Sequence, residues 1–101
     1  MSKPVLGQIE LRSLLREFKE QNAGRYHLLA LGYYGSYARN EATEDSDVDI
    51  VFDTDKPNLF TASAMRLDLE DLLERPVGLV QLRGLTDSRF IARVEREAIY
   101  V

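Results

Sequence analysis

Two short apolar runs, each joined to a small polar motif, constrain the fold of this chain more than any other feature. The first run, Tyr26 to Tyr34, is followed directly by Gly35-Ser36, and the second begins at Asp47-Val48-Asp49 and continues to Phe52. Short apolar runs bounded by turn residues predict buried β-strands. The first strand has apolar residues on both faces, which is typical of a central strand of a sheet. The sequence therefore predicts a sheet whose central strands carry polar residues at their ends.

The two acids of the second run fall on one side of the predicted strand. Alternate residues of a strand face the same way, so Asp47 and Asp49 face away from Val48 and Ile50. Their Cα atoms are expected about 6.6 Å apart. Carboxylates this close repel each other and raise each other's pKa unless a cation lies between them. Since Mg²⁺ is usually bound by one or two carboxylates together with substrate phosphates, the pair predicts a magnesium site.

The Gly35-Ser36 pair predicts a turn from strand to helix. We expect a short helix from Ser36 to about Glu41, capped by Ser36, with free N–H groups that bind a phosphate. Arg39 is the only basic residue between Gly35 and Asp55. It pairs either with a triphosphate or with a neighbouring acid, and the sequence leaves both open.

Together these motifs resemble a known family. Gly35-Ser36, ten further residues and Asp47-Val48-Asp49 are similar to the signature of the DNA polymerase β-type nucleotidyltransferase superfamily. Within it, they resemble the minimal nucleotidyltransferase (MNT) domains. An ordinary turn followed by a solvated acidic strand end is the alternative. The resemblance implies an α+β fold of α/β type, the nucleotidyltransferase palm. It is a small mixed β-sheet covered by about four helices, in a single domain over residues 1–101.

The remaining elements follow from hydrophobic periodicity and end signals. Helices are expected over residues 8–22, 59–75 and 88–97, and a strand over 77–82. Their end signals are Asn22-Ala23-Gly24, Pro76 and a cap at Asp87 or Ser88. We expect the apolar tail, residues 98–101, to pack on the sheet or on a partner.

Three tyrosines and the single histidine lie on or near the first strand. Tyr33, Tyr34 and Tyr37 are close to Gly35 in sequence, where they either stack on a nucleotide base or pack in the core. His27 is at the opposite end of the strand. We therefore expect a structural or surface role for this histidine.

One position departs from the family pattern. The resemblance implies a third acid on the strand after the long helix, which helps to hold the catalytic metals and to deprotonate the attacking hydroxyl. In Arg75-Pro76-Val77-Gly78-Leu79-Val80 that position is Gly78. A lost general base costs roughly 10²–10⁴-fold in rate. Gly78 therefore indicates a weak enzyme, a natural variant or a deliberate replacement.

Charge and composition exclude several classes of protein. The net charge is −4, and no basic patch of the kind that binds a nucleic-acid backbone is visible. There is no cysteine, and no apolar run approaches the roughly 20 residues of a membrane span. Residues Met1 to Pro4 precede no long apolar stretch, so we expect no signal peptide. These features fit a cytoplasmic protein.

The resemblance implies a function and a partner. The first hypothesis is an antitoxin that transfers AMP from ATP·Mg²⁺ to a tyrosine hydroxyl of a HEPN toxin, an all-helical RNase. Asp47 and Asp49 would hold a two-metal site, Gly35 and Ser36 the β- and γ-phosphates, and Arg39 would neutralise charge. The second hypothesis is a catalytically degenerate protein that neutralises its toxin by binding only. The third is a transferase acting on a small molecule, similar to aminoglycoside nucleotidyltransferases, although those carry an additional domain.

Overall fold

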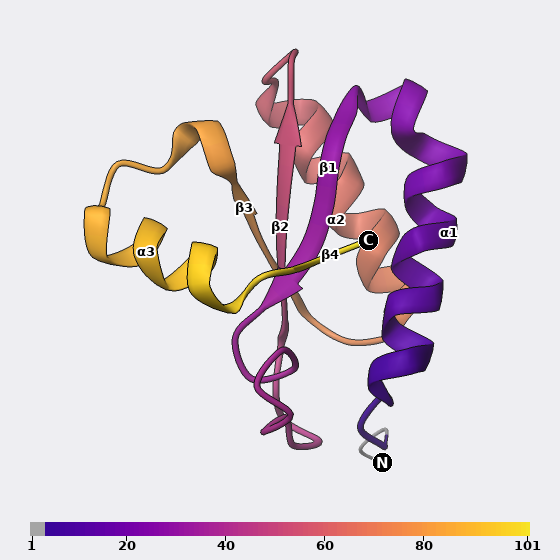
Figure 1. The fold of residues 1–101 in the computed structure, drawn as a ribbon. Coiled ribbons are helices and arrows are strands. Elements are labelled where there is room, and N and C mark those ends of the chain that lie inside the picture. The colour runs from indigo at the N-terminus through magenta and orange to yellow at the C-terminus, as the bar shows by residue number, and fades with distance from the viewer. Residues whose placement is uncertain (1–3) are drawn as a thin grey trace.

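The computed structural model describes residues 4–101 and contains one four-stranded mixed sheet (Figure 1). Its strands are β1 (Leu28–Tyr34), β2 (Val48–Thr54), β3 (Val77–Gln81) and β4 (Ile99–Tyr100), in the order β3-β2-β1-β4. β1 pairs antiparallel with β2 and β4, whereas β2 pairs parallel with β3. The mixed sheet expected from the resemblance is therefore confirmed. The expectation about a signal peptide rests partly on residues 1–3, which lie outside the described residues.

Helices cover both faces of the sheet. They are α1 (Gln8–Tyr26), α2 (Leu59–Leu73) and α3 (Ser88–Glu97), with a short 3₁₀ turn, η1 (Leu82–Gly84), after β3. α1 and α2 bury their apolar residues against one face, where the larger core lies, and α3 buries Val94 against the other face (Figure 1). No helix within residues 4–101 is long and apolar enough to cross a membrane.

Side-chain caps fix where two helices begin. Asn58 accepts hydrogen bonds from the N–H groups of Phe60 (2.8 Å) and Thr61 (3.2 Å) at the start of α2. Asp87 does the same for Arg89 (2.9 Å) and Phe90 (3.1 Å) at the start of α3. Such caps satisfy N–H groups that have no partner within the helix. Of the two caps considered for the last helix, the structure uses Asp87.

The first helix is longer than the sequence predicted. α1 continues past Gly24 to Tyr26, and the left-handed residue His27 (φ 52°) ends it. Gly24 costs a helix about 1 kcal/mol relative to alanine. The last turn compensates, because it buries the Tyr26 ring in a stack on Phe18 at 6.1 Å. β1 consequently starts at Leu28 rather than at residue 26, and His27 has the structural role expected for it.

The C-terminal tail joins the sheet because one residue of β1 has no side chain. A methyl group at Gly32 would lie 2.6 Å from the carbonyl oxygen of Ile99, which no ordinary contact allows. Glycine at this position therefore lets β4 approach β1. Of the two places expected for the tail, sheet and partner, the structure shows the sheet.

Candidate functional site

Asp49 lies near the start of β2, a central strand of the sheet, between two glycines. It is opposite Tyr34 of β1 and Gly78 of β3. A methyl group at Gly35 would lie 2.2 Å from Oδ2 of Asp49, and one at Gly78 would lie 3.1 Å from Oδ1. The carboxylate thus occupies space that side chains at these two positions would fill. The pairing of β2 with β3 places Gly78 directly beside Asp49.

Asp49 is an electrostatically unfavourable carboxylate. Burial raises its pKa, and the charges of Asp47 and Glu97 raise it further, while Arg93 and Arg39 act in the opposite direction. Within residues 4–101 Asp49 forms no ion pair shorter than 4 Å. A cation at this position would therefore be stabilised by the negative charges of Asp49 and its neighbours Asp47 and Glu97.

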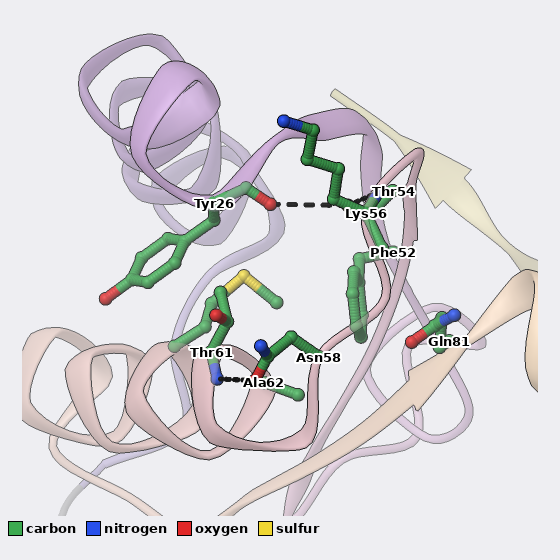
Figure 2. A pocket seen from close by; sticks show the side chains of 9 residues that line it. Tyr26, Phe52, Thr54, Lys56, Asn58, Thr61, Ala62 and Gln81 are labelled. Atoms are coloured by element: carbon green, nitrogen blue, oxygen red, sulfur yellow. Dashed lines mark hydrogen bonds between the residues drawn. The ribbon is translucent and has the colours of Figure 1, made fainter.

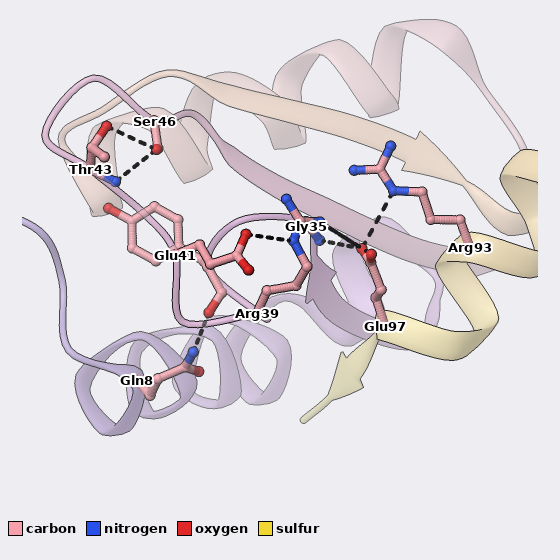
Figure 3. Close-up of polar contacts among 9 residues, drawn as sticks. Gln8, Gly35, Arg39, Glu41, Thr43, Ser46, Arg93 and Glu97 are labelled. Carbon is pink, nitrogen blue, oxygen red and sulfur yellow. Dashed lines mark hydrogen bonds and ion pairs between the residues drawn. The ribbon is translucent and has the colours of Figure 1, made fainter.

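Asp47 lies just outside the strand. It is exposed and precedes Val48, the first residue of β2. A turn orders the approach to it, because Oγ of Ser46 accepts a hydrogen bond from the N–H of Thr43 at 2.8 Å (Figure 3). The two acids of the predicted metal pair are thus close enough to interact electrostatically, but only one is shielded from water.

The donor set fits a cation that also has ligands from elsewhere. No group of three or more His, Cys, Asp or Glu side chains in the part of the chain that the structure describes could hold a metal ion. Asp47 and Asp49 supply carboxylate oxygens, and Gly78 supplies no side-chain ligand. Mg²⁺ commonly binds through one or two carboxylates with substrate phosphates and water. The pair therefore fits Mg²⁺ that is bound together with a phosphorylated substrate.

The segment after β1 is a pair of turns, so the expected helix from Ser36 to Glu41 is wrong. The N–H of Arg39 donates to the carbonyl of Gly35 (3.0 Å), and that of Glu41 donates to Ser36 (2.8 Å). Gly35 and Asn40 both adopt left-handed backbone, with φ of 73° and 60°. These two residues leave only four between them, which is too few for a stable helix. Ser36 is therefore a turn residue and not a helix cap. Within residues 4–101 the sheet is covered by three α-helices instead of about four.

A carboxylate from α3 binds this turn (Figure 3). Oε2 of Glu97 accepts a hydrogen bond from the N–H of Gly35 at 3.2 Å, and Nη1 of Arg39 donates to both carboxylate oxygens at 3.1 Å. Nε of Arg93 lies 3.5 Å from Oε2 of the same carboxylate. Nε of Arg39 also donates to Glu41 at 3.1 Å. Of the two partners left open for Arg39, the structure shows acids.

Glu97 and Arg93 were missed by the sequence analysis. Burial works to raise the pKa of Glu97, but the hydrogen bonds from Arg39 and Gly35 and the nearby positive charges outweigh it, and the pKa is lowered. Both residues lie in α3, about 60 positions after Gly35. The one signal available was their i, i+4 spacing, which indicates a pair on a helix face but not its partner.

The N-terminal helix supports the turn from the other face of the sheet. Gln8 of α1 donates a hydrogen bond to the carbonyl of Tyr37 and accepts one from the hydroxyl of Tyr33. Tyr33, Tyr34 and Tyr37 are all buried, and the ring of Tyr34 meets Phe90 edge-on at 5.8 Å. Of the two roles considered for these tyrosines, the structure shows packing.

A small hollow lies elsewhere (Figure 2). It opens beside the far end of β2, where Phe52 and Thr54 line it together with Tyr26, Lys56, Asn58, Thr61, Ala62, Met65 and Gln81. None of the residues predicted for metal or phosphate binding lines it. The hollow is therefore separate from the carboxylate site.

Known proteins resemble this chain over almost its whole length. The family model described as "Nucleotidyltransferase domain" matches residues 11–101. Protein adenylyltransferase MntA of Thermococcus cleftensis is 39% identical over 93 residues, which cover 91% of this chain and 93% of that protein. A solved structure described as a candidate minimal nucleotidyltransferase is 35% identical, with a TM-score of 0.77 over 93% of this chain and 95% of that one.

This chain is also similar, at lower sequence identity, to one chain of a solved protein complex. The solved structure of a tri-AMPylated Shewanella oneidensis HEPN toxin with its MNT antitoxin contains a chain 19% identical to this one. The TM-score is 0.59, over 92% of this chain and 66% of that chain. At this level of identity the comparison shows a shared fold.

Proposed function

Because the chain belongs to the nucleotidyltransferase domain family, we propose that it transfers AMP from ATP to a tyrosine hydroxyl of a HEPN-domain RNase and so acts as its antitoxin. The observation that carries the proposal is the half-buried carboxylate of Asp49, which lies beside the Gly35 turn and has no ion-pair partner among residues 4–101. Support for the acceptor comes from the relative named as a protein adenylyltransferase and from the AMPylated toxin in the structural neighbour. We propose that residues 1–101 act as one domain, in the cytoplasm, in a complex with the toxin.

Each site residue has a distinct role in this proposal. Asp47 and Asp49 hold Mg²⁺, which when bound neutralises charge on the phosphates. Gly35 and Ser36 lie against the β- and γ-phosphates, and Arg39 adds positive charge. Gly78 marks the place of the family's third acid and offers neither ligand nor base. The support for these positions is the carboxylate of Asp49 lying between Gly35 and Gly78.

The proposed reaction is a single displacement at phosphorus. The tyrosine oxygen attacks the α-phosphorus of ATP, and a new P–O bond forms. The bond from that phosphorus to the oxygen bridging the α- and β-phosphates breaks, and pyrophosphate leaves. Since Gly78 has no carboxylate, the phenol proton passes to water. Catalysis then consists mainly of positioning and charge stabilisation, and we expect it to be slow.

Gly78 also favours a second candidate function, neutralisation of the toxin by binding alone. A carboxylate at this position would lie directly against Asp49, as the 3.1 Å approach of a methyl group there shows. Its absence weakens metal binding and removes the base, and neutralisation by binding alone needs neither. A small-molecule acceptor is less well supported, since the 39% identical relative is named for a protein acceptor.

One experiment separates these functions. The protein is co-expressed with the HEPN protein encoded beside it and passed over a size-exclusion column. The mixture is then incubated with ATP and Mg²⁺, and the toxin is analysed by mass spectrometry and for RNase activity. A toxin that gains AMP on a tyrosine supports transfer. An unmodified but inhibited toxin in a stable complex supports binding alone, and separate elution without modification contradicts both.

The metal site is tested by calorimetry. ATP with Mg²⁺ is titrated into the parent and into the Asp47→Asn and Asp49→Asn variants. We expect nucleotide binding to weaken in both, because each removes one oxygen ligand. Unchanged affinity for ATP in both variants would show that Asp47 and Asp49 do not form the metal site.

A further inference from the structure

Glu97 joins the last turn of α3 to the turn that follows β1. Its carboxylate contacts the N–H of Gly35 and the guanidinium groups of Arg39 and Arg93, at 3.1–3.5 Å. The Glu97 side chain is only 14% exposed, whereas Arg39 is 36% and Arg93 46% exposed. An exposed ion pair contributes little, but a shielded carboxylate with a backbone N–H and two arginines forms a network. The contacts therefore fix the geometry of the turn.

The contacts to Glu97 and Glu41 engage only some of the N–H donors of Arg39 and Arg93. A guanidinium has five N–H donors. Nε of Arg39 donates to Glu41 and Nη1 of Arg39 donates to Glu97, while Nε of Arg93 forms an ion pair with Glu97 at 3.5 Å. Figure 3 shows the two side chains reaching the Glu97 carboxylate from different elements. Both arginines also act on Asp49, since each lowers its pKa. Glu97 also binds the N–H of Gly35, which adjoins Asp49, so both guanidinium groups lie at the edge of the carboxylate site. Among residues 4–101 their remaining N–H donors form no hydrogen bond and are available to a polyphosphate.

We propose that Glu97 is a positioning residue that holds Arg39 and Arg93 ready to bind the triphosphate of the nucleotide. The inference rests on the proposed function, because it takes ATP as the substrate. An arginine loses rotamer freedom when a ligand fixes it, and that loss weakens binding. Here the contacts to Glu97 already restrict the arginine rotamers when the protein folds. Binding of the nucleotide therefore costs less conformational entropy. Arg93 becomes a second phosphate-binding arginine, which the sequence motifs did not include.

The test compares matched charge changes on one helix. Glu97→Gln and Arg93→Gln are set against Glu95→Gln and Arg96→Gln, which change the same charges at exposed positions of α3 outside the network. Binding of ATP with Mg²⁺ is measured by calorimetry. We expect Glu97→Gln and Arg93→Gln each to weaken ATP binding about tenfold, and the double variant to be little weaker than either. The controls should stay within about twofold.

Further readouts distinguish positioning from a purely structural role. With the toxin as acceptor, we expect KM for ATP to rise about tenfold and kcat to change by less than about threefold in Glu97→Gln. A structural role would instead lower the melting temperature and kcat while the loss of ATP affinity was no larger than in the controls. If Glu97→Gln does not fold, Arg93→Gln still decides, because Arg93 is exposed and makes one contact to the network.

Two outcomes overturn the inference. Tighter ATP binding by Glu97→Gln would mean that its carboxylate competes with phosphate for Gly35 and the arginines. Unchanged binding in both Glu97→Gln and Arg93→Gln would mean that neither serves the nucleotide. In each case the Asp49→Asn variant shows whether the error concerns only the role of Glu97 or the nucleotide site as a whole. If Asp49→Asn weakens ATP binding, only the role of Glu97 is wrong, and if it does not, the nucleotide site itself is wrong.

Discussion

Asp49 and Glu97 are two partly buried carboxylates on either side of Gly35, and they differ in their partners and in the direction of their pKa shifts. Glu97 accepts the N–H of Gly35 and pairs with two arginines, and its pKa is lowered. Asp49 lies against the Cα of Gly35 without an ion pair among residues 4–101, and its pKa is raised. A carboxylate satisfied by its own chain holds structure together. One left in an unfavourable field is available to a cation from outside.

The largest effect is expected from Asp49→Asn. The change removes a metal ligand and the charge beside the transferred phosphate, so we expect AMP transfer to fall by about 10²-fold or more. The matched control is Asp53→Asn, four residues along the same strand. Asp53 is already paired with Arg83 at 2.8 Å, so its loss should change transfer by less than about threefold. Equal losses in the two variants, measured by mass spectrometry of the toxin, would show that any acid on this strand serves.

Gly35→Ala should disturb both carboxylates at once. The new methyl group would lie 2.2 Å from Oδ2 of Asp49, and a left-handed backbone costs a non-glycine residue about 1–2 kcal/mol. We expect a lower melting temperature and a loss of transfer approaching that of Asp49→Asn. The control is Gly24→Ala in α1, where a methyl group has open space and should stabilise by about 0.5–1 kcal/mol. A Gly35→Ala variant as active as the parent would show that the position of Asp49 is not critical.

Gly78→Asp should increase the difference between the two carboxylates, because it adds negative charge beside Asp49 and not beside Glu97. It places a third carboxylate against Asp49, so we expect a lower melting temperature in EDTA and partial recovery with Mg²⁺. AMP transfer should rise at least about tenfold, a lower bound set below the roughly 10²–10⁴-fold of a complete general-base effect. Gly78→Ala adds the same Cβ without the carboxylate and should not activate. If the parent transfers AMP well and Gly78→Asp is no better, the third acid comes from another position.

The smallest effect concerns pH and stability. Because the pKa of Asp49 is raised in the folded protein, folding favours its protonated form. The resulting stability is fully present below the ordinary value of 3.8 and is lost as pH rises through the folded pKa. Asp49→Asn should therefore melt a few degrees higher than the parent at pH 7 in EDTA. Melting curves at decreasing pH should show the difference shrink towards pH 3.8, and a constant difference would contradict this origin.

Much of the fold and part of the site follow from the sequence alone. The hydrophobic patterns place β1, β2, β3 and the helices α1, α2 and α3, but not β4. Asp87 caps a helix because its side chain reaches N–H groups two and three residues away. The same local logic identifies Asp47 and Asp49 as a pair. These features depend on residues a few positions apart, and spacing in the sequence records such distances directly.

Only the tertiary structure decided which distant residues complete the site. It brought Glu97 and Arg93 onto the Gly35 turn and Gln8 beneath it, and it set Gly78 against Asp49 through the pairing of β3 with β2. It also overrode one local signal by extending α1 past Gly24 to Tyr26. Contacts between residues 29 to 62 positions apart leave no periodic trace in the sequence. They depend on how the helices pack on the sheet, and burial there outweighs local preferences of about 1 kcal/mol.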